Sequence, residues 1–137
     1  MFHLTSPSTR DYNCLAWAIG RKDFWMWPNT DGHIKEPDEY WPENVPNDER
    51  PDTLVKAYET FGFKVSENAS QEEAYEKIAL YKSPYGNTFT HAARQLPDGT
   101  WTSKLSYWED IQHGTPQSLE GEIYGQVYCY MKRKKAQ

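Results

Sequence analysis

The apolar and polar residues of this chain follow a helical spacing in its first half and an alternating one in its second half. A short helix is predicted over 11–19, where polar residues precede a compact apolar run and Gly20 supplies the stop. A second helix is predicted over 51–61, because Pro51 suits a first helical turn and apolar residues then recur every three or four positions.

Alternating apolar residues and strong turn signals follow. The turn Pro97-Asp98-Gly99 is typical of a three-residue hairpin connection. Single helical turns are predicted over 70–73, which has the character of a capping box, and over 107–112. The strands are predicted over 63–65, 75–82, 88–96, 100–105 and 122–133.

Two stretches show neither the helical nor the alternating spacing of apolar residues. Residues 1–10 are predicted to be an extended lead-in, and residues 21–50, rich in Pro, Asn, Asp and Trp, a long loop packed down by its rings. Helices followed by antiparallel strands indicate an α+β fold, with N-terminal helices packed on an antiparallel β-meander. The length of 137 residues suits one domain over 1–137.

Composition narrows the classes of function. The formal charge of −5 argues against a nucleic-acid partner, and the basic run 132–135 is interpreted as a solvated tail. No stretch has the roughly 20 apolar residues of a membrane span, and the N-terminus lacks the pattern of a signal peptide, so a cytoplasmic location is expected. Cys14 and Cys129 are therefore predicted to be free thiols. The four histidines lie far apart and no CxxC or HExxH spacing occurs, so neither a metal nor another cofactor is expected.

Cys14 is the strongest candidate for chemistry. It falls in the first turn of the predicted helix 11–19, where unpaired backbone N–H groups and the helix dipole favour a thiolate. Packing of the thiol in the core is the alternative, since buried free cysteines are common. His91, on a predicted strand with small neighbours, is the candidate general base; a structural histidine that bonds a carbonyl is its alternative.

A third group should hold the imidazole. The turn at 97–99 sets a register in which Trp101, Ser103 and Leu105 share the face of His91. Ser103 is thus a candidate orienting residue by geometry. Asp110 is the stronger acceptor chemically, but its position is less determined by the pattern.

Substrate contacts are expected from residues that flank these groups. Gln95 shares the face of His91 and could orient it or contact substrate, and Trp101 could form a wall. Asn13, with the backbone N–H of Cys14, could donate to an oxyanion, and Trp17 follows in the same helix. The indoles in 21–50 could form a substrate shelf, although packing within the loop is the commoner role of such rings.

The stretches Asn13-Cys14-Leu15-Ala16-Trp17-Ala18, Thr90-His91-Ala92-Ala93-Arg94-Gln95-Leu96 and Trp101-Thr102-Ser103-Lys104-Leu105 resemble small bacterial domains with a papain-like fold. These domains are related to the NlpC/P60 group and include cysteine peptidase effector domains of polymorphic toxins. The resemblance implies a nucleophile at Cys14, a base at His91, and hydrolysis or transfer at an acyl centre. Ser103 stands where the wider group has His, Asn or Asp.

The sequence therefore predicts a thiol-dependent hydrolase, a cysteine peptidase or amidase, that acts on a protein or peptide. A bacterial effector delivered to a target cytoplasm by a larger secreted protein is one setting that the resemblance implies. Acyl transfer or deamidation of the transglutaminase kind would use the same groups. The remaining alternative is a catalytically inactive protein-binding module. The sequence does not indicate an oligomeric state.

Overall fold

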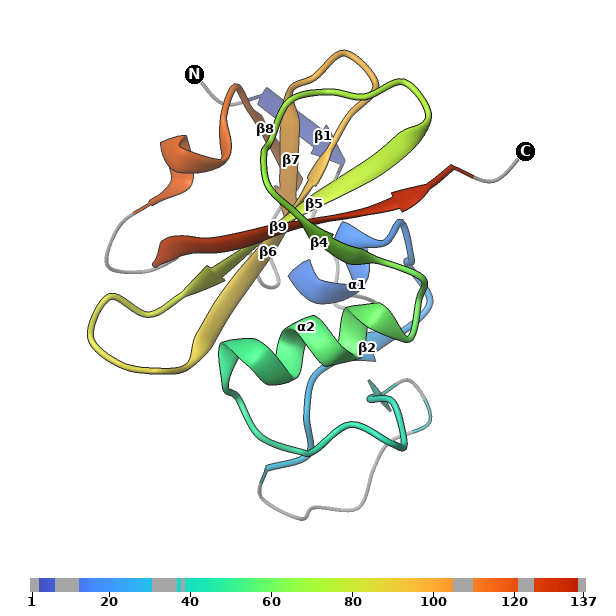
Figure 1. The fold of residues 1–137 in the computed structure, drawn as a ribbon, viewed down its shortest axis with the longest axis vertical. Helices are drawn as coiled ribbons and strands as arrows, with labels where there is room; N and C mark the ends of the chain where they lie inside the picture. The colour runs from blue at the N-terminus through green and yellow to red at the C-terminus, as the bar shows by residue number, and fades with distance from the viewer. Residues whose placement is uncertain are drawn as a thin grey trace.

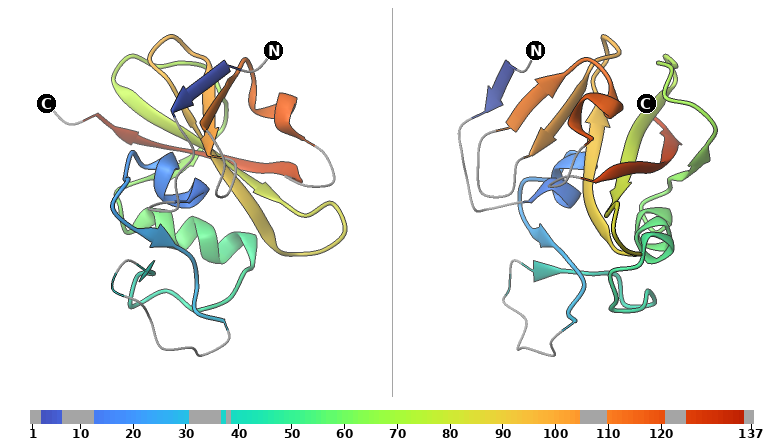
Figure 2. Two further views of the ribbon diagram at one scale, coloured as in Figure 1. Left: turned by 180° about the vertical axis from the view of Figure 1, so that it is seen from behind. Right: turned by 90° about the vertical axis from the view of Figure 1, so that its left-hand side faces the viewer.

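The computed structural model describes residues 3–6, 13–30, 37, 39–104, 110–120 and 125–135. Two helices and a strongly curved antiparallel sheet make up most of this part of the chain, so the fold is α+β, as predicted (Figure 1). Helix α1 (Cys14–Ala18) and helix α2 (Pro51–Glu59) lie on one face of the sheet, and the 3-10 helix η1 (Pro116–Leu119) lies on the other (Figure 2).

Seven strands form the main sheet in the order β1-β8-β7-β6-β5-β9-β4. Strands β5 to β8 follow one another as a meander, whereas β9 is inserted between β5 and β4, and β1 is added at the far edge. The bounds are β1 (His3–Ser6), β4 (Lys64–Ser66), β5 (Tyr75–Lys82), β6 (Phe89–Gln95), β7 (Trp101–Lys104), β8 (Asp110–His113) and β9 (Gln126–Lys134).

Both helices occur where the pattern predicts them. Asn13 caps α1, because its side-chain oxygen accepts from the backbone N–H of Ala16 at 3.2 Å. Pro51 opens α2, whose buried face includes Leu54 and Tyr58. The strands β4 to β7 and β9 also match their predicted ranges to within a few residues, and β5 has the predicted ends.

Three local predictions are wrong. Residues 70–73 form no helix; residues 73–74 are in a single turn, in which the N–H of Tyr75 donates to the carbonyl of Glu72 at 3.0 Å, and β5 follows directly. Residues 110–112 belong to strand β8, since their backbone pairs with both β7 and β1, while 107–109 lie outside the described residues. The predicted loop 21–50 contains a two-stranded parallel pair, β2 (Trp25–Met26) with β3 (Glu39–Tyr40).

The core is divided by the sheet into two clusters. On the helical face, α1 and α2 pack against Ile78, Leu80 and Ala92. On the other face, Ala79, Tyr81, Ala93 and Trp101 form a second cluster. Successive residues of a strand point to opposite faces, so neighbours in β5 and β6 belong to different clusters.

Candidate functional site

Cys14 is the first residue of α1, so it lies in the first turn of the helix as predicted, although the helix begins three residues later than expected. Its exposed fraction is 8 %, and it belongs to the cluster on the helical face of the sheet. Tyr58 of α2 lies close to it: the phenolic hydroxyl donates to the carbonyl oxygen of Leu15 at 2.8 Å. Burial, and secondarily the charge of Cys14, hold the pKa of Tyr58 well above its usual value. The tyrosine is thus a neutral donor beside the thiol.

His91 lies on β6 opposite Tyr81, and the two rings meet edge to face with 5.2 Å between their centroids. The side chain is 1 % exposed. Burial, and secondarily the charge of His113, lower the pKa of His91 to about 3. The imidazole is therefore neutral at physiological pH.

The structure does not bring Cys14 and His91 to one face of the sheet. Ala92, which follows His91 in β6, packs in the cluster of Cys14. Tyr81, the cross-strand partner of His91, packs in the cluster on the other face. Since paired residues share a face and consecutive ones alternate, the imidazole points away from α1. In this arrangement Cys14 and His91 do not share a cleft. Their roles as nucleophile and base stay predictions.

Ser103 contacts a different histidine from the one predicted. The predicted register is confirmed, because Gln95 pairs with Trp101 and the N–H of Leu96 donates to the carbonyl of Thr100. Ser103 does share the face of His91, but its hydroxyl lies 2.9 Å from Nε2 of His113.

His113 is also buried, and its Nδ1 lies 2.8 Å from the carbonyl oxygen of Thr115. A carbonyl only accepts, so Nδ1 carries the proton and Nε2 accepts from the Ser103 hydroxyl. Burial lowers the pKa of His113 despite the opposing effect of Thr115. The sequence prediction missed this pair because it placed a helical turn immediately before His113.

The other predicted site residues are dispersed. Asn13 is 2 % exposed, and its amide bonds both backbone groups of Met26, with Nδ2 donating to the carbonyl at 2.7 Å and Oδ1 accepting from the N–H at 3.0 Å. Trp101 is 1 % exposed, so its ring offers no open surface to a substrate. Gln95 donates to the carbonyl of Ala69 at 2.8 Å. Their substrate contacts stay predictions.

Trp17 and Asp110 complete the set. The indole of Trp17 contacts two cations, with Lys22 Nζ 5.3 Å and Arg94 Cζ 5.5 Å from its ring centroid. Asp110 begins β8, where its Cα is paired with that of Lys104; its side chain lies outside the described part of the structure.

The segment that carries β2 and β3 has a cavity of about 200 Å³, which we call the aromatic pocket. Trp27 and Trp41 supply its rings, and both contact Phe89, at centroid distances of 4.9 and 6.3 Å. Among the described residues, the charged ones that line it are both acidic, Glu39 and Glu43. The sequence predicted that these indoles pack within the loop or form a shelf, but gave no sign that carboxylates join them.

Within the described ranges, no cluster of three or more His, Cys, Asp or Glu side chains is placed to hold a metal ion. The same residues include no helix with the length and apolar character of a membrane span.

Comparison with known proteins gives one match. Residues 3–132 match the model of a family described as Domain of unknown function (DUF7689). No curated protein and no solved structure matches the chain.

Proposed function

We propose that this chain, which belongs to the DUF7689 family, is a binding module whose aromatic pocket takes a cationic side chain of a protein partner. The observation that carries the proposal is the combination of two indoles and two carboxylates around one cavity. The electron-rich face of an indole attracts an ammonium or guanidinium group, and a carboxylate binds the same group by a charge-assisted hydrogen bond.

The walls of the aromatic pocket are held in place by contacts with neighbouring residues and with one another. Trp41 stacks on Phe89 with an angle of 13° between the rings, and its Nε1 donates to the carbonyl of Pro46 at 2.9 Å. The N–H of Asn29 donates to Oδ1 of Asn47 at 2.9 Å, which joins the two sides of the segment. A pocket formed before the ligand arrives loses less entropy on binding.

The position of the predicted catalytic pair favours binding over catalysis. A general base has to reach the proton that it removes, within hydrogen-bond distance or through one water. Cys14 and His91 point to opposite faces of the sheet, and Asn13 is engaged with Met26. Catalysis would require a rearrangement that brings Cys14 and His91 together, whereas binding in the aromatic pocket requires none.

Titration of the protein with N-acetyl-lysine methylamide tests the proposal, followed by the indole N–H signals in NMR spectra. Trp27→Phe assigns the signal of Trp27. We expect this signal to move with the lysine compound and not with the norleucine analogue, which has similar length and no charge. Glu43→Gln should weaken binding at least tenfold, whereas Glu73→Gln, at an exposed carboxylate outside the aromatic pocket, should leave it unchanged. Equal binding of norleucine, or an unaffected Glu43→Gln, would show that the pocket does not bind cations.

A papain-like thiol hydrolase is the second candidate. The observation in its favour is that Cys14 begins a helix packed against β6, the strand of His91. In that function the Cys14 thiolate attacks an amide carbonyl, the imidazole of His91 returns a proton to the leaving amine, and water releases the acyl group from the thioester. An amine in place of water would give acyl transfer.

Alkylation by iodoacetamide at pH 6, followed by mass spectrometry, separates the two candidates. Cys129 is an internal control, because burial and then the charge of Asp52 raise its pKa to about 11. A binding module predicts slow alkylation of Cys14 that does not depend on His91. Fast alkylation of Cys14 that His91→Ala abolishes, with Cys129 still protected, would replace the binding module by the hydrolase. Exposure of Cys129 in the variant would reveal unfolding, in which case His91→Gln takes its place.

A further inference from the structure

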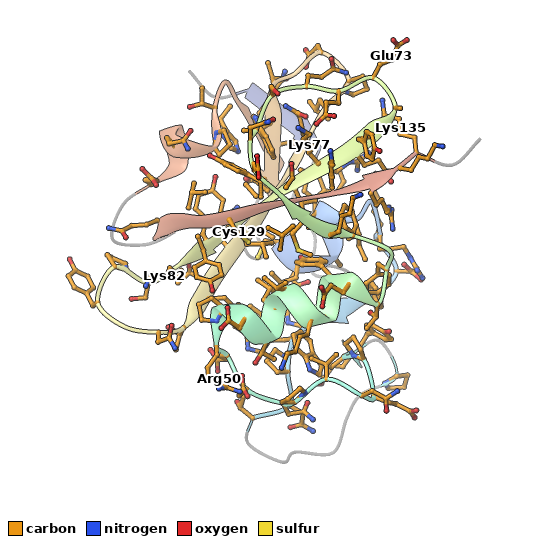
Figure 3. All side chains as sticks on the ribbon, in the orientation of Figure 1. Arg50, Glu73, Lys77, Lys82, Cys129 and Lys135 are labelled. Atoms are coloured by element: carbon orange, nitrogen blue, oxygen red, sulfur yellow. The ribbon has the colours of Figure 1, made fainter. Side chains whose placement is uncertain are left out.

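A second cavity, of about 160 Å³, opens where the ends of β5, β6 and β9 meet the C-terminal end of α1. Among the described residues, two cationic ones line it: Arg94 of β6, and Lys135, which follows β9 and is labelled in Figure 3. We call this cavity the basic pocket. Its position is distinct from the aromatic pocket, and no residue lines both.

Arg94 packs against an aromatic ring. Its guanidinium carbon lies 5.5 Å from the ring of Trp17. Within the part of the chain that the structure describes, no carboxylate forms a salt bridge with Arg94 or with Lys135. A guanidinium is planar, and its N–H donors have the geometry that binds an oxyanion in bidentate fashion; the contact with the indole restricts the orientation of that plane.

Among the described residues, Glu76 is the carboxylate that lines the basic pocket, and it is already engaged. Glu76 accepts from Nε of Arg133 at 2.6 Å, and the same guanidinium donates to the carbonyl of Phe61 at 2.9 Å. Glu76 therefore neutralises Arg133, and among the described residues no carboxylate is paired with Arg94 or Lys135. Lys22, over the same indole as Arg94, adds a third cation nearby. This concentration of positive charge occurs in a chain whose formal charge is −5.

We propose that the basic pocket binds the oxyanion of a small ligand, a carboxylate or a phosphate, between Arg94 and Lys135. Arg94 supplies paired N–H donors, and Lys135, which also lines the cavity, supplies a point charge. The volume admits a small anionic group and not a folded domain. The ligand is opposite in charge to the one proposed for the aromatic pocket, so each site can be tested without the other.

The test is the melting temperature of the intact protein in sodium phosphate and, separately, in N-acetylglycine, at an ionic strength kept constant with sodium chloride. A ligand that binds only the native state raises the melting temperature in proportion to the logarithm of its concentration once the site is nearly full. We expect at least one of the two anions to do this. Stabilisation by phosphate alone identifies a phosphoryl ligand, and stabilisation by N-acetylglycine alone identifies a carboxylate.

Arg94→Gln should weaken the apparent affinity at least tenfold and Lys135→Gln by a smaller factor. The control is Arg50→Gln, because Arg50 pairs with Asp48 and lies at the opposite end of the molecule (Figure 3). Each variant is compared with its own melting temperature in chloride, so a lower intrinsic stability does not obscure the result. Stabilisation by neither anion, or equal stabilisation of wild type and both pocket variants, overturns the proposal.

Discussion

The side chain of Asn13 forms hydrogen bonds with both the backbone N–H and the backbone carbonyl of Met26, and it also caps α1. This one side chain therefore fixes the start of α1 to β2, across 13 residues of chain. Both residues are almost fully buried, so the hydrogen bonds have no water to replace them.

We expect Asn13→Ala to lower the free energy of unfolding by about 2–4 kcal/mol, because it removes a helix cap and leaves two buried backbone groups of Met26 without partners. Urea unfolding followed by circular dichroism measures the change. Asn87→Ala, at an exposed position, is the matched control and should shift the midpoint little. A small effect of Asn13→Ala would mean that water takes over the contacts.

Buried His91 makes stability depend on pH. An unfolded histidine takes up a proton near pH 6.5, whereas His91 in the native state does so only at about pH 3. Between these values the unfolded chain holds more protons, so stability falls as the pH is lowered, by up to about 1.4 kcal/mol per pH unit. Urea midpoints from pH 7 to pH 4.5 should therefore drop less steeply in His91→Gln than in wild type. If the midpoints of the two proteins fell in parallel, another group would be responsible for the pH dependence of stability. His113, whose pKa is also lowered, is then the next residue to substitute.

Lys77 is a fully buried ammonium, and Glu72 is its counterion at 2.6 Å. The ammonium of Lys77 also donates to two oxygen atoms of Asn68, the backbone carbonyl at 3.3 Å and Oδ1 at 3.0 Å. The hydrogen bond from Lys77 is the main cause that lowers the pKa of Glu72. The carboxylate thus stabilises the fold above its unfolded pKa, and this contribution is lost as the pH falls through the lower native value.

Glu72→Gln should consequently destabilise the protein at pH 7 and differ less from wild type at pH 3, as thermal unfolding at the two values will show. Its neighbour Glu73 is exposed and points away from the molecule, so Glu73→Gln is the control (Figure 3). An equal effect of the two substitutions would contradict a specific role for the ion pair with Lys77.

Gly125 occupies a position that only glycine fits. Its φ is +85°, and an added Cβ would lie 2.0 Å from the carbonyl oxygen of Lys82. Gly125→Ala should lower stability by roughly 3 kcal/mol or more, because strain and a backbone clash add together. At Gly62, φ is +91° with open space around the position, so Gly62→Ala should cost only about 1 kcal/mol. Chemical denaturation of both variants separates the clash from the conformational strain.

The sequence predicted elements best where one pattern governs many residues. β5 comes from a run that alternates in part and has the predicted ends, and the turn at 97–99 fixed the pairing of Gln95 with Trp101. β8 is short and polar, and it is a strand because β7 and β1 pair with both of its edges. Such long-range pairing leaves no periodic signal in four residues.

The candidate site shows the same limit. Alternation correctly placed Ser103 on the face of His91, but which face α1 covers is decided by the docking of a helix about 75 residues earlier in the chain. Likewise, the carboxylates of Glu39 and Glu43 join Trp27 only when the segment folds back on itself. Pattern analysis identifies residues with chemical potential, whereas their grouping depends on tertiary packing.

The insertion of β9 between β5 and β4 has a consequence for synthesis of the protein. β4 pairs with β9, which is translated some 60 residues later. A nascent chain that ends before β9 therefore lacks the strand that pairs with one edge of β5 and with one edge of β4. Before β9 is translated, these two edges can pair with a neighbouring chain. Addition of β9 to the sheet covers both of them at once.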